Sequence, residues 1–418
     1  MRIAVLSDFH LGFSLTSELE KDAFENAKEA MERALDSDLV IIAGDIFDTK
    51  SPKPRTWYNV LRLLSIPLRK EARIKLIHSS KELKEIVKKR VLNHLPVIAL
   101  HGNHERSPRG EVNAIQILES AGLLIYLHRD VVVFEKDDVR VAIHGMSHVP
   151  ERFAFTFLKD WNPQPIEDCV NILLLHQSID PYIYSPIDAP SLNLSNLPRG
   201  FDIIIDGHVH TSIVEKVDST LFIIPGSTVI TQFQPSEAQT NKGFIQIEIE
   251  DGKIRTEFIP LRTTRRFFYK EIEIERGSKS KIEEAIEDFL KKNTSEKKPV
   301  IRLKIMGEEV DIIDKELQEI EKRYKDRAII LFSKEIVSPE IRQKIELLRS
   351  LREQRKSVKE IGMSLLEENL KELGFEKSFD VERIFHILEE GDVDKAISVL
   401  LGEQITLDKF KLSGWLKS

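Results

Sequence analysis

Side chains that can bind metal ions or move protons follow several apolar runs in the first half of the chain. The run at 203–205 leads into Asp206-Gly207-His208-Val209-His210, and earlier runs lead into D-F-H, G-D-I-F-D, G-N-H-E and H-Q. Because open α/β sheets bind ligands at the carboxyl ends of their strands, we expect these side chains to meet. Oxygen or imidazole ligands are offered by Asp8, His10, Asp45, Asn103, His176, His208 and His210.

This ligand set predicts a centre with two metal ions. Seven ligands are too many for one ion of low coordination number and suit two divalent ions that share a carboxylate. Imidazole with carboxylate, and no thiolate, favours manganese, iron or zinc. Asp8 and Asp45 would cancel half of the charge of the two ions, and a hydroxide with a phosphodiester anion would cancel the rest. Such a pair, about 3.5–4 Å apart, suits phosphodiester hydrolysis.

Three glycines lie beside the predicted ligands in the sequence. Gly44, Gly102 and Gly207 are expected to let the backbone turn sharply and to keep large side chains out of the site.

Single histidines without partners are more often ordinary polar residues, which is expected for His78, His94, His128 and His386. Three further histidines lie near the site loops and are expected behind the ligands or outside the site: His101, His144 and His148.

The elements that must position these residues alternate as in an α/β protein. Expected strands are RIAVLS, DLVIIAG, PVIALHG, VRVAIHG, NILLLHQ, DIIIDG and TLFIIPG, and expected helices include 22–35, 55–64 and 112–122. Most of these strands are apolar at every position, so both faces should be covered. The pattern predicts an α/β domain over residues 1–262.

The rest of the chain differs in pattern. Residues 267–275, 300–306 and 327–334 are predicted strands, separated by helices at 280–292 and 311–324, which gives a small accessory domain at 263–338. A helical region, 339–418, follows. Its basic stretch at 341–360 is expected to be a solvated helix face, with DNA contact as the less favoured alternative. Two apolar stripes predict a helix pair, with Val381, Ile384, Phe385 and Leu388 on one arm and Val393, Ala396, Ile397 and Leu400 on the other.

Bulk composition limits the class of protein. The chain has 418 residues, 41% hydrophobic and 31% charged, a formal net charge of −7 and one cysteine, Cys169. A disulfide within the chain is excluded, and a uniformly basic DNA-coating surface is disfavoured. The sequence enters a strand at once and has no apolar run of the roughly 20 residues that span a bilayer. A cytoplasmic protein without membrane attachment is therefore expected, nuclear or nucleoid-associated according to the organism.

The motifs D-x-H, G-D-x-x-D, G-N-H-E and G-H-x-H, in this order, resemble the calcineurin-like metallophosphoesterases over residues 1 to about 260. That resemblance implies a sandwich of two sheets flanked by helices. PGSTVITQFQPSEA at 225–238, NKGFIQIEI after it and IPLRTTRRFFYKEIEI at 259–274 are similar to the "meiotic recombination eleven" family of double-strand-break repair nucleases, in its archaeal and eukaryotic branch.

The resemblance implies roles for the site residues. It assigns a first metal to Asp8, His10, bridging Asp45 and His210, and a second to Asp45, Asn103, His176 and His208, with manganese as the usual ion. His104 would act on the scissile phosphate as proton donor or transition-state stabiliser. Asp48, where some members have a histidine implicated in exonuclease action, is the second candidate catalytic residue. A turn residue that hydrogen-bonds the loop backbone is the slightly favoured alternative for Asp48.

It also implies partners. The accessory segment would be a DNA-capping domain, and the C-terminal helices would dock an SMC-like coiled-coil ABC ATPase. A homodimer would form through the helices at 55–64 and 112–122, with contributions from Val60, Leu64, Ile115 and Leu118. Burial of these four side chains in the core is an equally open interpretation.

The predicted function is a manganese-dependent DNA nuclease, with 3′→5′ exonuclease and single-strand endonuclease activity, in double-strand-break repair. One alternative is a metallophosphatase that acts on small phosphodiesters or phosphoproteins. Its motifs are the same, but it has no need of the accessory and C-terminal regions. The other alternative is a DNA-end-tethering scaffold with a vestigial metal site, against which the intact ligand set argues.

Overall fold

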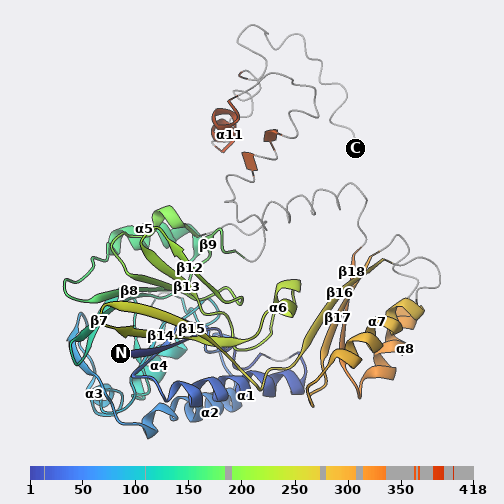
Figure 1. The fold of residues 1–418 in the computed structure, drawn as a ribbon, viewed down its shortest axis with the longest axis horizontal. Coiled ribbons are helices and arrows are strands. Elements are labelled where there is room, and N and C mark those ends of the chain that lie inside the picture. Colours follow the sequence, from blue (N-terminus) through green and yellow to red (C-terminus); the bar gives the residue numbers. More distant parts are fainter. Residues whose placement is uncertain are drawn as a thin grey trace. The chain divides into compact units, whose positions relative to one another are not determined.

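Two packed β-sheets form the centre of the protein in a computed structural model (Figure 1). The structure describes residues 1–13, 15–108, 110–183, 191–273, 279–306, 314–335 and 380–389, with single positions or pairs at 362–363, 366–367 and 399. The first sheet has the order β15 (Lys253–Pro260), β14 (Gly243–Glu250), β1 (Arg2–Leu6), β2 (Leu39–Ile42), β4 (Val97–Ala99), β5 (Ile125–Tyr126). The second has the order β12 (Ile213–Val217), β13 (Thr220–Ile224), β11 (Ile203–Asp206), β8 (Val170–Leu175), β7 (Val139–Met146), β6 (Asp130–Lys136), β3 (Lys75–Ser79).

Parallel pairing aligns the strand ends that carry the predicted ligands. In the first sheet β1, β2 and β4 are parallel, with Leu6 opposite Ile42 and Ile42 opposite Ala99. In the second sheet β8 and β11 are parallel, with Leu175 opposite Asp206. The residues that follow these strands therefore leave each sheet at one edge. All seven strands predicted from apolar runs are present, as β1, β2, β4, β7, β8, β11 and β13.

The apolar strands are buried on both faces, as predicted. Ile3 and Val5 of β1 lie in the core between the sheets, whereas Ala4 and Leu6 contact the outer helices. Helices α1 (Ser17–Ala34), α2 (Pro54–Leu64) and α4 (Ala114–Ser120) cover the first sheet, and α5 (Glu151–Trp161) covers the second (Figure 1). This two-sheet sandwich flanked by helices is the fold class that the sequence analysis predicted.

Shorter elements complete this region. They are helix α3 (Glu85–Arg90), helix α6 (Pro235–Gln239), the paired strands β9 (Ile179–Asp180) and β10 (Leu192–Asn193), and short 3-10 turns at Pro67–Arg69 and Leu194–Asn196. The predicted helix at 112–122 is shorter at both ends, because Asn113 and Gln116 form a capping box at its start and Gly122 follows it with φ of +68°. No helix in the described part of the chain has both the length and the apolar composition needed to cross a bilayer.

The four residues predicted to form a dimer interface belong to the core instead. Val60, Leu64, Ile115 and Leu118 are fully buried in the cluster between the first sheet and its helices. The prediction that they contact a second copy is wrong, because an apolar helical stripe has the same spacing whether it faces a core or a partner. The apolar side chains that α2 and α4 expose are Tyr58, Leu61 and Ile117, and Val112 is exposed just before α4.

The predicted β-α-β-α-β pattern of the accessory segment is confirmed. Strands β16 (Phe267–Glu273), β17 (Val300–Met306) and β18 (Ile329–Glu335) form a parallel sheet, here called the capping sheet (Figure 1). Helices α7 (Lys279–Lys292) and α8 (Asp314–Tyr324) pack on one face of it. Arg265, just before β16, and Lys297, between α7 and β17, form ion pairs with Asp22 of α1. The segment is therefore tied to the sandwich by charge as well as by packing.

By their contacts, residues 1–184 and 188–339 form one compact unit, and residues 185–187 and 340–418 form another. In the second unit α11 (Val381–Glu389) is described, and Ile384 and Ile387 are its buried residues. Ile387 takes the place predicted for Leu388, which is exposed. The basic stretch at 341–360 and the predicted second arm at 393–400 lie outside the described residues, apart from Val399.

Candidate metal centre

The seven predicted ligands meet at one end of the sandwich and come from both sheets. Asp8 and His10 follow β1, Asp45 follows β2 and Asn103 follows β4. From the second sheet, His176 follows β8, and His208 and His210 follow β11. Three groups of ligand atoms lie within 4.8 Å of one another: Asp8 with His10 and His210, His10 with Asp45 and His104, and Asp8 with Asp45 and His176.

One half of the cluster is built on facing imidazoles. Nε2 of His10 lies 3.0 Å from Nε2 of His210, and these two atoms lie 3.8 and 3.7 Å from Oδ1 of Asp8. Nδ1 of His10 lies 3.1 Å from Oδ1 of Asp48 and must donate to it, since an ionised carboxylate only accepts. Nε2 of neutral His10 therefore presents a lone pair towards His210 and Asp8, where a cation would fit.

The other half is built around an amide oxygen. Oδ1 of Asn103 lies 3.2 Å from Nε2 of His176 and 3.2 Å from Nδ1 of His208. Oδ2 of Asp45 lies 3.3 Å from Nε2 of the same His176. Asp45 thus contacts this half and also belongs to a group with His10. A position between the two halves is what a bridging carboxylate requires.

The electrostatics of the cluster call for positive charge. Both carboxylate oxygens of Asp8 are buried and accept no hydrogen bond from the described residues. Burial lowers the pKa of His176, but Asp45 outweighs burial and raises that pKa to about 10. Burial in turn would raise the pKa of Asp45, and His176 holds it well below its usual range. Buried carboxylates without enough partners are strongly unfavourable, and divalent cations would compensate them.

Backbone conformation is unusual at four of the seven residues. The φ angles are +52° at Asp8, +46° at His10, +49° at Asp45 and +72° at His208. Such left-handed conformations of residues other than glycine persist where the surrounding structure enforces them, and they cluster at functional sites. Here they follow from strands that end and turn within one or two residues of a ligand.

The glycines of the site leave room for the ligands, as predicted. A Cβ atom at Gly44 would overlap the ring of His176, and one at Gly102 would overlap the carboxylate of Asp45. At Gly207 a Cβ would crowd both His176 and Oγ of Ser7. Gly44 also has φ of +104°, which other residues rarely adopt.

The two residues predicted to be catalytic lie beside the first half of the cluster. The side chain of His104 is 35% exposed, its Nδ1 donates to the carbonyl oxygen of Asp48 at 2.8 Å, and its ring centroid lies 4.8 Å from that of His10. The carboxylate of Asp48 accepts from His10 and not from the loop backbone. The expectation of a simple turn residue at Asp48 is therefore wrong, because its carboxylate orients His10 and its carbonyl orients His104.

Residues that the sequence analysis missed hold the site loops in place. Glu105, fully buried, accepts from the backbone N–H of Phe47 at 2.8 Å and of Gly102 at 2.9 Å, which joins two ligand loops. Burial, with a contribution from Asp45, raises the pKa of Glu105 to about 8. Glu105 belongs to the motif G-N-H-E, which indicated that it lies near the site, but its hydrogen-bond partners are evident only from the fold. Glu237 and Lys242, also missed, lie behind His210.

The histidines with ambiguous expectations separate into two groups. His148 and His101 lie behind the ligands: the ring of His148 is 6.3 Å from that of His176, and His101 hydrogen-bonds the carbonyl of His148 and the hydroxyl of Tyr126. His144 contacts Asn171 and Phe201 instead of the ligand cluster.

Comparison with known proteins finds relatives among double-strand break repair proteins of several organisms. The double-strand break repair protein mus-23 of Neurospora crassa is 29% identical over 65% of this chain and 40% of its own length. The DNA double-strand break repair protein Mre11 of Methanopyrus kandleri is 29% identical over 66% of this chain and 60% of its own length. The Mre11 protein of Thermoplasma acidophilum is 28% identical over 72% of this chain and 76% of its own length.

These relatives confirm the resemblance to the meiotic-recombination-eleven repair proteins, although the chain spans only about 40 to 60% of the length of the first two. The sequence model of the family described as calcineurin-like phosphoesterase matches residues 1–212, half of the 418-residue chain. Those residues contain all seven predicted ligands and His104. The chain belongs to the calcineurin-like phosphoesterase family.

Proposed function

We propose that this protein is a manganese-dependent DNA nuclease, with 3′→5′ exonuclease and single-strand endonuclease activity, that processes DNA ends in double-strand-break repair. The observation that carries the proposal is the seven-ligand cluster, five of whose members are buried, in which the carboxylate of Asp8 has no hydrogen-bond partner among the described residues. The repair proteins to which the chain is similar support DNA as the substrate.

In this proposal Asp8, His10, Asp45 and His210 hold one ion, and Asp45, Asn103, His176 and His208 hold the other. Manganese is the proposed ion, and iron or zinc suits the same donors. When bound, two divalent ions lower the pKa of a water molecule and stabilise charge on phosphoryl oxygens. His104 donates from Nδ1 to the carbonyl of Asp48. In the imidazolium form its Nε2–H would bind the substrate phosphate or give its proton to the departing oxygen, which leaves the ring neutral.

Cleavage assays on several substrates test this function. We expect the protein with Mn²⁺ to degrade a labelled 3′-recessed duplex and to open a DNA hairpin, and to lose both activities in EDTA. The Asp45→Ala variant serves as the blank, because its preparation would still contain any contaminating nuclease. Bis(p-nitrophenyl) phosphate is included as a substrate that any metallophosphodiesterase can hydrolyse.

The outcomes separate the alternatives. Hydrolysis of bis(p-nitrophenyl) phosphate without cleavage of DNA would replace the nuclease by a phosphodiesterase of small substrates. Absence of all hydrolysis, with retained binding of DNA ends, would favour a tethering scaffold. If the Asp45→Ala variant cleaves DNA as fast as the unmodified protein, the metal centre does not cause the cleavage.

The proposed homodimer uses the exposed sides of α2 and α4. Leu61 and Tyr58 on α2, with Ile117 on α4, are large apolar side chains that the single chain leaves in water. Both helices pack on the same core cluster, which fixes them on one side of the first sheet. Exposed apolar side chains that gather into one contiguous patch are typical of an interface.

Sedimentation equilibrium tests the dimer. The Leu61→Asp/Ile117→Asp double variant is expected to sediment as a monomer at concentrations where the unmodified protein is a dimer, because charge in the interface would be desolvated. Phe153→Asp on α5 is the matched control, since Phe153 is equally exposed but lies on the second sheet. A dimer that persists in the double variant, or a dimer lost in the control, would contradict this surface.

The proposed domains are a nuclease domain at 1–262, a DNA-capping domain at 263–338 and an ATPase-docking region at 339–418. Helices α7 and α8 cover one face of the capping sheet. Its other face contacts Leu19 of α1 and Phe233, and we propose that the remainder of this face contacts DNA. In the docking region, Leu388 of α11 is exposed beside the buried Ile384 and Ile387. An apolar side chain in that position suits helix docking to an SMC-like coiled-coil ABC ATPase. Such a complex would act in the nucleus or at the nucleoid.

A further inference from the structure

The connection between β13 and β14 lies between the metal centre and the capping sheet. Its residues 230–242, here called the strap, include α6. On one side the strap contacts His210 through Thr231, Glu237 and Lys242. On the other side it contacts β16 and β17. No role in ligand binding was predicted for it.

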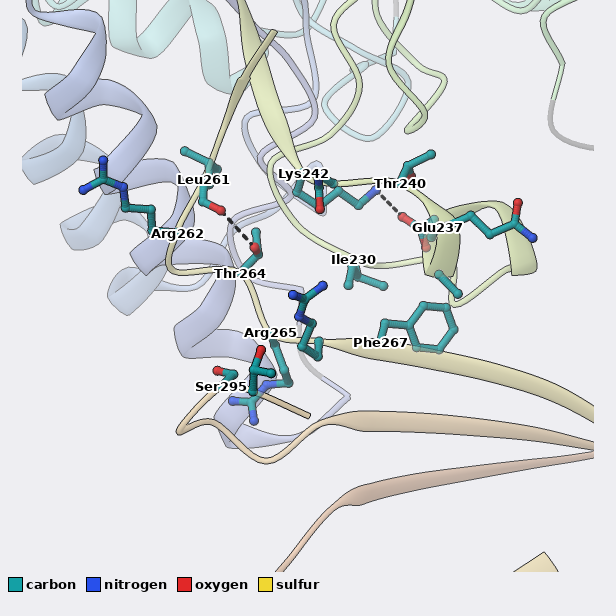
Figure 2. A pocket seen from close by; sticks show the side chains of 15 residues that line it. Ile230, Glu237, Thr240, Lys242, Leu261, Arg262, Thr264, Arg265, Phe267 and Ser295 are labelled. Atoms are coloured by element: carbon teal, nitrogen blue, oxygen red, sulfur yellow. Dashed lines mark hydrogen bonds and ion pairs between the residues drawn. The ribbon is translucent and has the colours of Figure 1, made fainter. Parts of the chain in front are cut away.

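A buried ion pair forms the centre of the strap. Nζ of Lys242 lies 2.6 Å from Oε1 of Glu237, and the two residues are only 2% and 3% exposed (Figure 2). Two charges taken out of water are strongly unfavourable unless their remaining hydrogen bonds are made. Here they are made: Oε2 of Glu237 accepts from the N–H of Gln232 at 3.0 Å and of Phe233 at 2.8 Å, and Lys242 donates to Oγ of Ser227 at 2.8 Å.

The pair also fixes His210. Nζ of Lys242 donates to the carbonyl oxygen of His210 at 3.1 Å, which holds its backbone. Nδ1 of the His210 ring lies 3.1 Å from Oγ1 of Thr231 and 3.7 Å from Oε1 of Glu237. A metal-binding histidine is usually oriented by a partner at its second ring nitrogen. The strap supplies such partners at Nδ1, while Nε2 faces His10 and Asp8.

Contacts on the other side join the strap to the capping sheet. Nη1 of Arg302 on β17 donates to the carbonyl oxygen of Phe233 at 3.1 Å. The ring of Phe233 packs edge-on against Phe267 of β16, with ring centroids 5.6 Å apart. Phe233 has φ of +53°, a conformation that must be held by its surroundings. Its N–H is bound by Glu237 and its C=O by Arg302, so a shift of β17 acts directly on Glu237.

Two further contacts hold the strap to the sandwich: the ring centroid of Phe233 lies 6.2 Å from that of Phe13, and the N–H of Leu261 donates to the carbonyl oxygen of Lys242 at 2.9 Å. Glu237 and Lys242 also line a cavity of about 410 Å³, together with Arg262, Thr264 and Phe267, so this side of the strap is not packed (Figure 2). The contacts to Arg302 and Phe267 are the ones that join the strap to the capping sheet.

We propose that Glu237 and Lys242 are positioning residues through which the capping sheet sets the orientation of His210. The contacts run from Arg302 through Phe233 to Glu237, and from Glu237 and Lys242 to His210. The inference rests on the proposed function in one respect, namely that His210 binds one of two metal ions. It goes beyond that function because it makes metal binding responsive to the capping sheet, which supplies no ligand.

Mn²⁺ binding to the full-length protein, followed by calorimetry and by electron paramagnetic resonance, tests this inference without an activity assay. Arg302→Ala is expected to weaken one Mn²⁺ site by up to about 10-fold and to leave the second site unchanged. This is the lower end of the effect of losing a direct partner of a ligand, because Arg302 acts on His210 through Phe233 and Glu237. Arg302→Lys, which keeps a donor, is expected to restore most of the affinity. Thermal unfolding in EDTA should change little, since a general loss of structure would weaken both sites.

Lys304→Ala is the matched control. Lys304 lies on β17 two residues from Arg302 but pairs with Glu271 and Glu335 of the capping sheet, so its loss should leave both Mn²⁺ sites unchanged. Glu237→Gln/Lys242→Met removes the buried charges together, which avoids leaving one charge unpaired, and should weaken the same single site as Arg302→Ala.

Two kinds of failure are distinguishable. If the unmodified protein binds two Mn²⁺ ions and Arg302→Ala binds both with the same affinities, the strap does not position His210, while the proposed function stands. If the unmodified protein binds no pair of Mn²⁺ ions, the proposed metal centre and this inference fall together.

Discussion

Replacing Asp8 by asparagine is expected to lower DNA cleavage by roughly 1,000-fold or more, equivalent to about 4 kcal/mol of transition-state stabilisation, and at the same time to stabilise the metal-free protein. Both oxygens of Asp8 are buried and accept no hydrogen bond from the described residues, so without a cation the charge is unfavourable. Asparagine removes the charge and tolerates φ of +52°. Thermal unfolding measures the second effect: the melting temperature should rise in EDTA and should no longer respond to Mn²⁺.

Asp38→Asn is the control for this prediction. Asp38 is also buried, but its carboxylate accepts from the N–H of Arg2 at 2.8 Å and pairs with Lys136 at 2.9 Å. Its replacement should destabilise the protein in EDTA and should preserve the response to Mn²⁺. If Asp8→Asn behaves in the same way as Asp38→Asn, the carboxylate of Asp8 is a structural group and the metal assignment is wrong.

Replacing His104 by glutamine is expected to reduce kcat by about 100- to 10,000-fold, the range in which a positioned proton donor acts, with unchanged Mn²⁺ affinity. The reason lies in how His104 contacts the ligands. Its backbone N–H, which every substitution retains, donates to Oδ1 of Asp45 at 3.1 Å. Within the described residues, the hydrogen bond of its ring goes to the carbonyl oxygen of Asp48. Single-turnover cleavage and calorimetry of the same samples separate the two quantities.

The exposed His78 on β3 provides the comparison, since His78→Gln makes the same chemical change outside the cluster. It should cleave DNA at the unmodified rate. A His104→Gln enzyme with normal single-turnover rates, or one that has lost an Mn²⁺ site, would exclude the proposed role of His104 in proton transfer or phosphate binding.

The ligand cluster could be predicted from sequence because its signals are local. Each ligand follows an apolar run long enough to be a buried strand, and parallel strands end at one edge of their sheet. The runs themselves do not say that β1, β2 and β4 belong to one sheet and β8 and β11 to another. That division follows from pairing between distant segments, such as β1 with β14, and only the family resemblance suggested it.

Outer partners of the ligands could not be predicted, for a related reason. Glu237 and Lys242 have the charge and the surrounding sequence of ordinary surface residues, and their burial depends on the capping sheet and on His210. The same limit applies to Val60 and Ile115, whose helical spacing fits a core as well as an interface. Local pattern predicts which residues share a face, whereas the identity of what covers that face is decided by the rest of the chain.

The placement of β1 in the first sheet has a consequence for the newly made protein. β1 lies between β2 and β14, so its second edge stays unpaired until residues 243–250 have been synthesised. The ligands from the other sheet are likewise complete only after residue 210. Under the proposed function, a nascent chain would thus emerge from the ribosome without a complete metal centre, and it would gain activity only when the sandwich closes.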